Sequence, residues 1–162
     1  MTLATTKTQP MDTSNLEYAG FWIRLWASAI DSVLVGVIIW PVLTLIYGRE
    51  YWSSAKLIQG PVDVLVSLVL PAIAIVVFWI SRQATPGKMA ISARIVDAKT
   101  GGPPTSAQLV GRYLGYYVSM LPLFLGMIWV AFDPRKQGWH DKLAGTVVVR
   151  QKRGPTTVAF EP

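Results

Sequence analysis

The sequence has 162 residues, of which 52% are hydrophobic and only 15% are charged, and its formal net charge is +6. Soluble domains carry about 25% charged residues, so this composition argues against a soluble globular domain and favours a membrane protein. The chain contains no cysteine, which excludes disulfide bonds, thiolate catalysis and cysteine-ligated metals. The Lys and Arg residues lie beside apolar runs instead of forming one basic patch, and nucleic-acid binding is therefore not expected.

The first apolar run follows a polar segment, residues 1–18, that we expect to be a flexible tail. This tail has no hydrophobic stretch of the kind found in cleavable signal peptides, so the run that follows should be the targeting signal and remain in the mature protein. We predict the first span at residues 25–47, where Asp31 is the only charge. At about 1.5 Å per residue it reaches about 35 Å, enough for a hydrocarbon core of about 30 Å. Pro41 is expected to kink it.

The second span is predicted at residues 64–81, which carry no charge and have Pro71 at their centre. A polar region follows, in which Ile91, Ala93 and Ile95 alternate with polar residues before a Gly-Gly turn. This alternation predicts a short strand. The sequence TVVVR, residues 146–150, predicts a second one.

A third apolar run is interrupted by Pro122 and Gly126. If all three runs crossed the membrane, seven Lys and Arg would lie on one side and eight on the other, which gives no orientation. If segment 107–132 instead turns at Pro122–Gly126 and returns, only Arg49 and Lys56 of the fifteen lie outside. Membrane proteins concentrate Lys and Arg on the cytoplasmic side. We therefore prefer a re-entrant segment, which also brings the two strands together, over a single kinked crossing.

Arg24 and Asp31 are seven residues, or two helical turns, apart. They lie on roughly one helix face, about 10 Å apart along the axis. We expect Arg24 to reach toward Asp31, directly or through a third group. A carboxylate inside a span costs about 2.5–3.5 kcal/mol and usually faces a helix bundle or a cavity, which makes Asp31 the strongest functional candidate. The alternative is that Asp31 forms a structural pair with a basic group of the C-terminal region.

The C-terminal stretch FDPRKQGWHDKLAGT adds Asp133, His140 and Asp141. Histidine titrates near neutral pH and could relay protons, although one His beside one Asp is more often a surface pair. No set of three or four metal ligands is present, and TPGK, residues 85–88, lacks the full phosphate-loop pattern. We therefore expect no metal, no cofactor and no enzymatic activity.

The chain resembles the RDD family of bacterial membrane proteins over about residues 19–150. The similarity lies in AGFWIRLWASAID, TPGK, RIVDAKTGGP, RYLGYY and FDPRKQGWHDKLAGTVVVR. The resemblance implies that Arg24 is the family arginine and Asp31 the first family aspartate. Asp141 is expected to be the second, with Asp133 as the competitor. Gln83 stands where many members have glycine. A transport role has been suggested for the family.

These observations predict an all-α membrane protein with two transmembrane helices, a Pro/Gly-broken third segment that is re-entrant or spanning, and a small cytosolic β element. The membrane domain covers residues 19–153, and a flexible tail follows at 154–162. We expect a multi-pass protein of the bacterial cytoplasmic membrane with a cytoplasmic N-terminus.

The predicted function is ion or small-solute transport through a charged cluster of Arg24, Asp31 and Asp141, with Asp133 and His140 nearby. Because two or three helices cannot enclose a pathway, this requires a homo-oligomer or a larger membrane complex. The alternative is a non-transporting accessory or scaffold subunit of such a complex.

Overall fold

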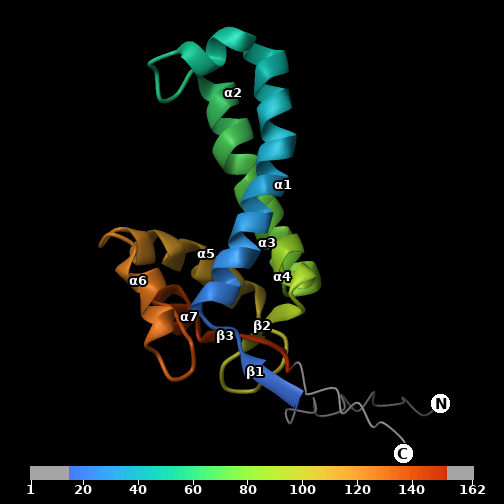
Figure 1. Ribbon diagram of the computed structural model, residues 1–162, viewed down its shortest axis with the longest axis vertical. Coiled ribbons are helices and arrows are strands. Elements are labelled where there is room, and N and C mark those ends of the chain that lie inside the picture. The colour runs from blue at the N-terminus through green and yellow to red at the C-terminus, as the bar shows by residue number, and fades with distance from the viewer. Residues whose placement is uncertain (1–14, 153–162) are drawn as a thin grey trace, which may run out of the picture.

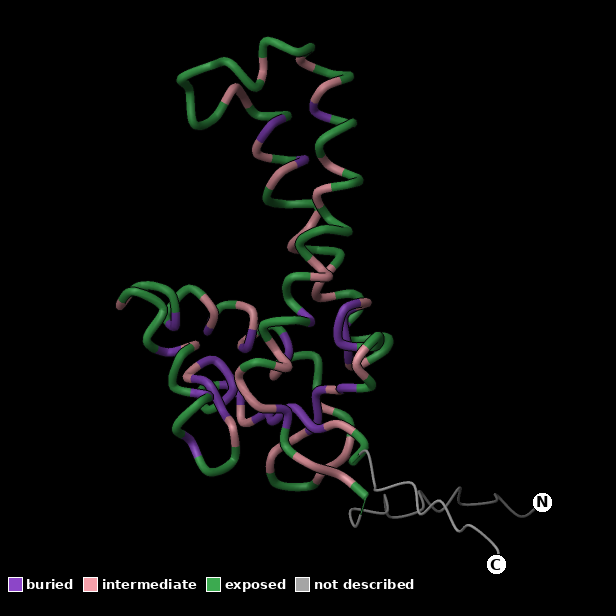
Figure 2. Tube along the Cα trace, in the orientation of Figure 1, coloured by how far each residue is buried: buried purple, intermediate pink, exposed green. Residues whose placement is uncertain are grey.

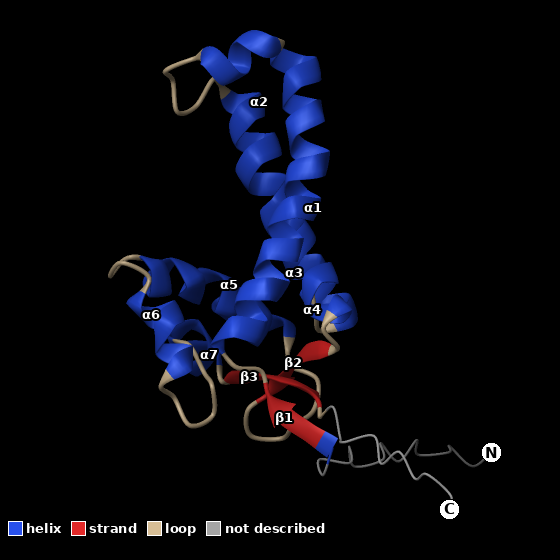
Figure 3. Cartoon of the chain, viewed as in Figure 1, coloured by secondary structure: helices blue, strands red, loops and turns tan. Residues whose placement is uncertain are grey.

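Two long helical arms rise side by side from a small sheet, and a group of shorter helices lies beside their lower end (Figure 1). The computed structural model describes residues 15–152. Helices make up most of this part of the chain, and the sheet has three strands (Figure 3). The helices are α1 Phe21–Tyr47, α2 Pro61–Val64, α3 Leu70–Arg82, α4 Pro86–Ala90, α5 Ser106–Met120, α6 Leu125–Ile128 and α7 Trp139–Ala144. The strands are β1 Leu16–Tyr18, β2 Ala93–Asp97 and β3 Thr146–Gln151.

The two arms are helices long and apolar enough to cross a membrane. They comprise α1 and the continuous helical stretch from Pro61 to Arg82. Most of their residues are exposed, whereas buried residues gather around the sheet (Figure 2). Apolar side chains that face outward over a long helix belong in lipid. Both predicted spans are present, but each begins earlier than expected, at Phe21 instead of residue 25 and at Pro61 instead of residue 64.

Each arm contains an internal proline. α1 is continuous through Pro41. In the second arm, a π-helical turn at Leu65–Val69 precedes Pro71, which lies in the first turn of α3. A proline ring clashes with the carbonyl four residues earlier, which here belongs to Ser67 within the π turn. The wider turn therefore provides room for the ring where a regular α-helix would not.

The third apolar segment is broken, as the sequence predicted. α5 and the helical stretch Leu125–Ala131 are bent by 114°. The turn between them contains Leu123 and Phe124, both with positive φ angles. Gly126 is not part of this turn, contrary to expectation, but lies in α6. A Cβ at Gly126 would come within 2.7 Å of Ser119 Cα, so glycine permits α6 to pack closely against α5.

The sheet has the order β1–β3–β2, and both pairings are antiparallel. The two predicted strands therefore pair directly, with Ile95 opposite Val148. β1 was not predicted and lies within residues 1–18, which were expected to be a flexible tail, so regular structure begins before α1. Residues 1–14 and 153–162, which include the rest of the two predicted tails, lie outside the described residues.

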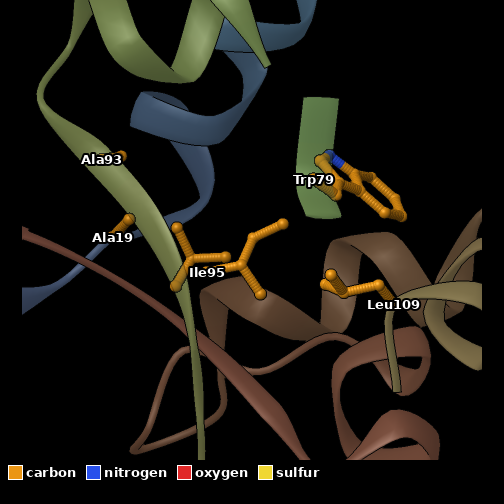
Figure 4. Close-up of a cluster of buried hydrophobic side chains, with 6 residues drawn as sticks. Ala19, Trp79, Ala93, Ile95 and Leu109 are labelled. Carbon is orange, nitrogen blue, oxygen red and sulfur yellow. The ribbon is translucent and has the colours of Figure 1, made fainter. Parts of the chain in front are cut away.

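A small apolar core joins the sheet to the helices (Figure 4). Ile95 of β2 and Val148 of β3 are fully buried against Trp79 of α3 and Leu109 of α5, with Ala19 and Ala93 beside them. The start of α5 is fixed by a capping box: the Thr105 hydroxyl accepts from the Gln108 N–H, and the Gln108 side chain accepts from the Thr105 N–H. Together, the cap and the core position the polar residues of α5 over the sheet end of α1.

Candidate functional site

Asp141 is the centre of a buried ionic cluster that joins three distant parts of the chain. Its Oδ2 accepts from Arg24 Nη1 and from the Gly138 backbone N–H at 2.9 Å, and its Oδ1 accepts from Arg112 Nη1. The Asp141 side chain is 0% exposed. Burial alone raises its pKa, but the nearby guanidinium groups of Arg112 and Arg24 outweigh burial and hold the pKa of Asp141 below its ordinary value. The carboxylate is therefore permanently ionised.

The sequence places Asp141 here through a helix start. Gly138 is the residue before α7, and Asp141 is the third residue of the helix. Its side chain reaches back to the Gly138 N–H as in a capping box. A carboxylate at this position also interacts favourably with the partial positive charge of the helix N-terminus. The expectation that Asp141 belongs to the charged cluster, in preference to Asp133, agrees with this geometry.

Arg24 donates to three acceptors from different segments. Its Nη1 contacts Asp141, its Nε donates to the Ala19 carbonyl at 2.8 Å, and its Nη2 donates to the Lys136 carbonyl at 2.5 Å. This set corrects the expectation that Arg24 reaches toward Asp31. Its guanidinium instead connects the start of α1 to the loop before α7.

Arg112 is the second arginine of the cluster, and the sequence did not identify it as one. The side chain is fully buried, and it also donates to Thr146 Oγ1 at 2.9 Å. Its guanidinium lies 5.4 Å from the centre of the Trp79 ring and 5.8 Å from that of Tyr116, as in cation–π contacts. A signal was present, because an arginine within a helix of apolar and aromatic residues requires an acidic partner.

Asp31 lies apart from this cluster and is held by the loop and helix of residues 85–88. Its Oδ2 accepts from Thr85 Oγ1 at 2.5 Å, and its Oδ1 accepts from the Gly87 backbone N–H at 2.6 Å. A Cβ at Gly87 would overlap the Ala27 carbonyl of α1. Glycine therefore allows α4 to approach α1 closely enough for its N–H to reach the carboxylate. The TPGK motif, which the sequence alone left without a role, contributes to this contact.

Lys88 follows directly in α4 and is only 6% exposed. Its Nζ lies 5.8 Å from the centre of the Trp79 ring. Burial lowers the pKa of Lys88 below its ordinary value. Within residues 15–152, no carboxylate comes within 4 Å of its ammonium group. Lys88 is a second buried cation that sequence reasoning missed.

His140 belongs to the Asp141 cluster as a neutral group. Its Nε2 is 3.6 Å from Asp141 Oδ2, its Nδ1 is 3.2 Å from Ser119 Oγ, and its ring stacks on Tyr116 with centroids 4.0 Å apart. Burial lowers the pKa of His140 to about 3. The ring is therefore uncharged near neutral pH and fills space between α5 and α7.

Asp133 has a different set of partners. It forms an ion pair with Lys142, and its Oδ2 accepts from the backbone N–H groups of Arg135 and Gln137, each at 3.1 Å. These contacts fix the loop before α7. Of the five predicted residues, Arg24, Asp141 and His140 meet, whereas Asp31 and Asp133 are each held elsewhere.

A cavity of about 510 Å³ lies between α1, α3, α4 and α5. Asp31, Lys88, Trp79 and Tyr116 are among the residues that line it. Because His140 is neutral, the charged groups around the cavity and the cluster are Arg24, Arg112 and Lys88 against Asp31 and Asp141. One positive charge is in excess. The arrangement therefore combines an ionic cluster centred on Asp141 with a neighbouring cavity lined by Lys88, which has no ion-pair partner within residues 15–152.

Comparison with known proteins identifies relatives of this chain. A model of the RDD family matches residues 18–145. An uncharacterized protein of Rickettsia prowazekii is 32% identical over 65% of this chain, which spans 62% of that relative's length. The uncharacterized membrane protein YteJ of Bacillus subtilis is 30% identical, over 83% of this chain and 82% of the relative. The uncharacterized protein YxaI of the same organism is 28% identical, over 81% and 96%. No solved structure matches the chain.

Proposed function

The chain belongs to the RDD family of membrane proteins, and from this premise we propose that it is a non-transporting accessory subunit of a complex in the bacterial cytoplasmic membrane. In this proposal, Arg24, Arg112 and Asp141 form a structural lock that fastens α7 and β3 onto α1 and α5. The observation that carries it is the set of contacts at Asp141, whose two buried oxygens accept from three donors. Two of these donors are permanently charged. A cation or a proton that bound this carboxylate would compete with both arginines.

The lock would give the protein a rigid surface at one end of the membrane helices. The sheet and α7 are held by the buried cluster and by the apolar core around Ile95. A surface of this kind suits docking of a partner subunit or a second copy of the chain. Such docking needs neither catalysis nor a cofactor.

The proposed orientation places the N-terminus, the sheet and the C-terminal region in the cytoplasm, with segment 107–132 entering and leaving the membrane on that side. Of the fifteen Lys and Arg residues, only Arg49 and Lys56 fall between the two arms. This distribution matches the positive-inside rule. The direct pairing of β2 with β3 supports the same topology, because these strands flank the segment.

A reporter fused after Arg153 tests this orientation. A fluorescent protein that matures only in the cytoplasm should be bright there, and a phosphatase that is active only outside the cytoplasm should be inactive. The same reporters inserted between Ser54 and Ala55 should give the opposite result. If both positions report the same side, or if Arg153 reports the outside, the proposed topology is wrong.

Transport remains the second candidate function, and one observation favours it. Asp31 lies within α1 and lines the cavity between the arms, where an intramembrane carboxylate is a hint of ion or proton handling. A pathway would need further helices from a homo-oligomer. Its carboxylate already accepts from Thr85 and Gly87, and for this reason we rank transport second.

A flux experiment separates the two candidates. Purified protein in liposomes is given proton, sodium and potassium gradients, and wild type is compared with Asp31→Asn and Asp141→Asn. We expect wild-type flux no greater than that of protein-free liposomes, and a lower unfolding midpoint for Asp141→Asn. Flux that is present in wild type and lost in a correctly folded Asp31→Asn variant would establish transport and refute the accessory role.

A further inference from the structure

The ammonium group of the buried residue Lys88 has no direct counter-ion among residues 15–152. α4 carries it to the sheet end of the two arms (Figure 3), where its nearest described contact is the face of Trp79. Trp79 has its own indole N–H buried without an acceptor in the described part of the chain. Polar groups removed from water are normally satisfied by hydrogen-bond or charge partners. Lys88, which lines the cavity without an ion-pair partner in the described part of the chain, and the Trp79 N–H beside it indicate that an acceptor from outside the chain belongs here.

The two carboxylates nearby are already occupied. Asp31 accepts from the Thr85 hydroxyl and the Gly87 N–H, and Asp141 accepts from two arginines. Neither approaches Lys88 closely enough to form an ion pair. Protonated Lys88 therefore has no ion-pair partner among the described residues, and an anion, which would also stabilise its charged form, is the complementary ligand.

The shape of the cavity adds a second requirement. Near the sheet its lining includes polar residues such as Ser28, Thr85 and Lys88. Farther along the arms it is apolar, with residues such as Ile38 of α1 and Pro71 of α3. Ser28 and Ile38 are ten residues apart in one helix, or about 15 Å. A ligand that fills this space has a polar end beside Lys88 and an apolar body that extends between the arms.

We infer that this cavity binds one anionic membrane lipid, with its headgroup phosphate against Lys88 and an acyl chain between α1 and α3. A volume of about 510 Å³ lies within the usual range of about 300–1,000 Å³ for small-molecule sites. The bilayer supplies the ligand directly, because the arms that enclose the cavity are the two helices suited to span it. Lys88 makes no ion pair with Asp141, but the site adjoins the Asp141 cluster, because Trp79 and Tyr116 line the cavity and also contact Arg112.

Lipid binding to purified, delipidated protein in detergent tests this inference. Native mass spectrometry measures the affinity for dioleoyl phosphatidylglycerol and for dioleoyl phosphatidylcholine, which has the same chains but no net charge. Wild type should bind the anionic lipid at least about tenfold more tightly. Lys88→Met should abolish this preference and leave binding of the neutral lipid unchanged. Lys99→Met removes the same charge from an exposed turn and should behave as wild type.

Two further experiments distinguish the source of the anion and test the role of the apolar end of the cavity. Inorganic phosphate and glycerol phosphate, which lack acyl chains, should not displace the bound lipid. Ala74→Trp, which fills the cavity between the arms, should lower the affinity for the anionic lipid at least about tenfold. Its unfolding midpoint should stay near that of wild type. Equal affinity for the two lipids in wild type, an unchanged preference in Lys88→Met, or displacement by inorganic phosphate would overturn the inference.

Discussion

Asp63 and Asp141 are both buried carboxylates with three hydrogen-bond donors, but they lie at opposite ends of the molecule. Asp63, at the far end of the arms, accepts from the Tyr51 hydroxyl, the Gln59 N–H and the Ser67 hydroxyl, all within 12 residues in the sequence. Asp141 accepts instead from Arg24, which is 117 residues away, and from Arg112, which is 29 residues away. The far end is therefore held by local, neutral donors, whereas the sheet end is held by cations from distant segments.

This difference has an energetic consequence. A local set of neutral donors can find water or other partners when the carboxylate is removed, especially at an exposed helix connection. A buried arginine that loses its carboxylate partner remains charged, and no other anion is at hand to pair with it. Substitutions at the two ends should therefore differ clearly in cost, although the two carboxylates have the same number of partners.

The largest effect is expected at Asp141. Asp141→Ala leaves Arg24 and the fully buried Arg112 without their acceptor, and breaking a buried ion pair costs about 3–5 kcal/mol. Denaturant unfolding in detergent, followed by near-ultraviolet circular dichroism, should show this loss of stability. The double variant Asp141→Leu with Arg112→Met should recover part of it, because one unpaired charge is removed. A loss below about 1 kcal/mol for Asp141→Ala would mean that the cluster is not a lock.

The second effect depends on pH and concerns His140. Its pKa in the folded chain is about 3, against about 6.5 in an unfolded chain. Because the unfolded chain takes up a proton that the folded chain does not, stability falls as the pH drops below about 6.5, by about 2 kcal/mol at pH 5. Aspartates contribute little to this slope, since they titrate at lower pH.

His140→Phe separates this contribution from others. It keeps an aromatic ring against Tyr116 but cannot titrate. Unfolding midpoints measured between pH 7 and pH 5 should fall for wild type and fall less for the variant. Parallel pH profiles for the two proteins would mean that His140 is not the group responsible.

Much of the sheet end could be anticipated from the sequence, but not all the partners of its buried cations. Arg24 and Asp141 were predicted as members of one cluster, and β2 and β3 were predicted to pair, because local patterns identify helix starts and strands. Arg112 was missed as a cluster member and Lys88 as a cavity residue, since their burial depends on tertiary contacts, such as those of both side chains with Trp79 of α3. The same reason explains the error at Arg24, whose closeness to Asp31 along α1 suggested a pair that tertiary contacts replace. β1 is only three residues long and carries too little pattern to be recognised.

The third effect, smaller than those at Asp141 and His140, is expected at the far end. Asp63→Asn keeps a side-chain oxygen with two acceptor lone pairs, and it leaves no buried cation without a partner. It should lower the unfolding midpoint slightly and leave the near-ultraviolet signal of the sheet end unchanged. A loss as large as that of Asp141→Ala would remove the distinction between local and distant partners.

The smallest effect has the opposite sign. Gln83 follows α3 with a φ angle of +57°, a conformation that glycine adopts without steric cost. Gln83→Gly should therefore raise the stability by up to about 1 kcal/mol, and thermal unfolding in detergent measures the shift. Gln83→Val should lower it, because a β-branched residue is strained at this φ. If glycine lowers the stability instead, the contacts of the Gln83 side chain stabilise the fold by more than its positive φ angle costs.

The sequence separation of Arg24 and Asp141 also sets a time order during synthesis. At about 5–20 residues per second, a ribosome needs about 6–23 seconds to reach Asp141 after it has made Arg24, and both membrane arms are complete before then. Arg24 and Arg112 therefore have no Asp141 carboxylate to pair with until α7 emerges from the ribosome. A chain that stops short of α7 would keep two exposed or poorly buried arginines beside the membrane, a feature by which quality-control proteases could tell unfinished molecules from finished ones.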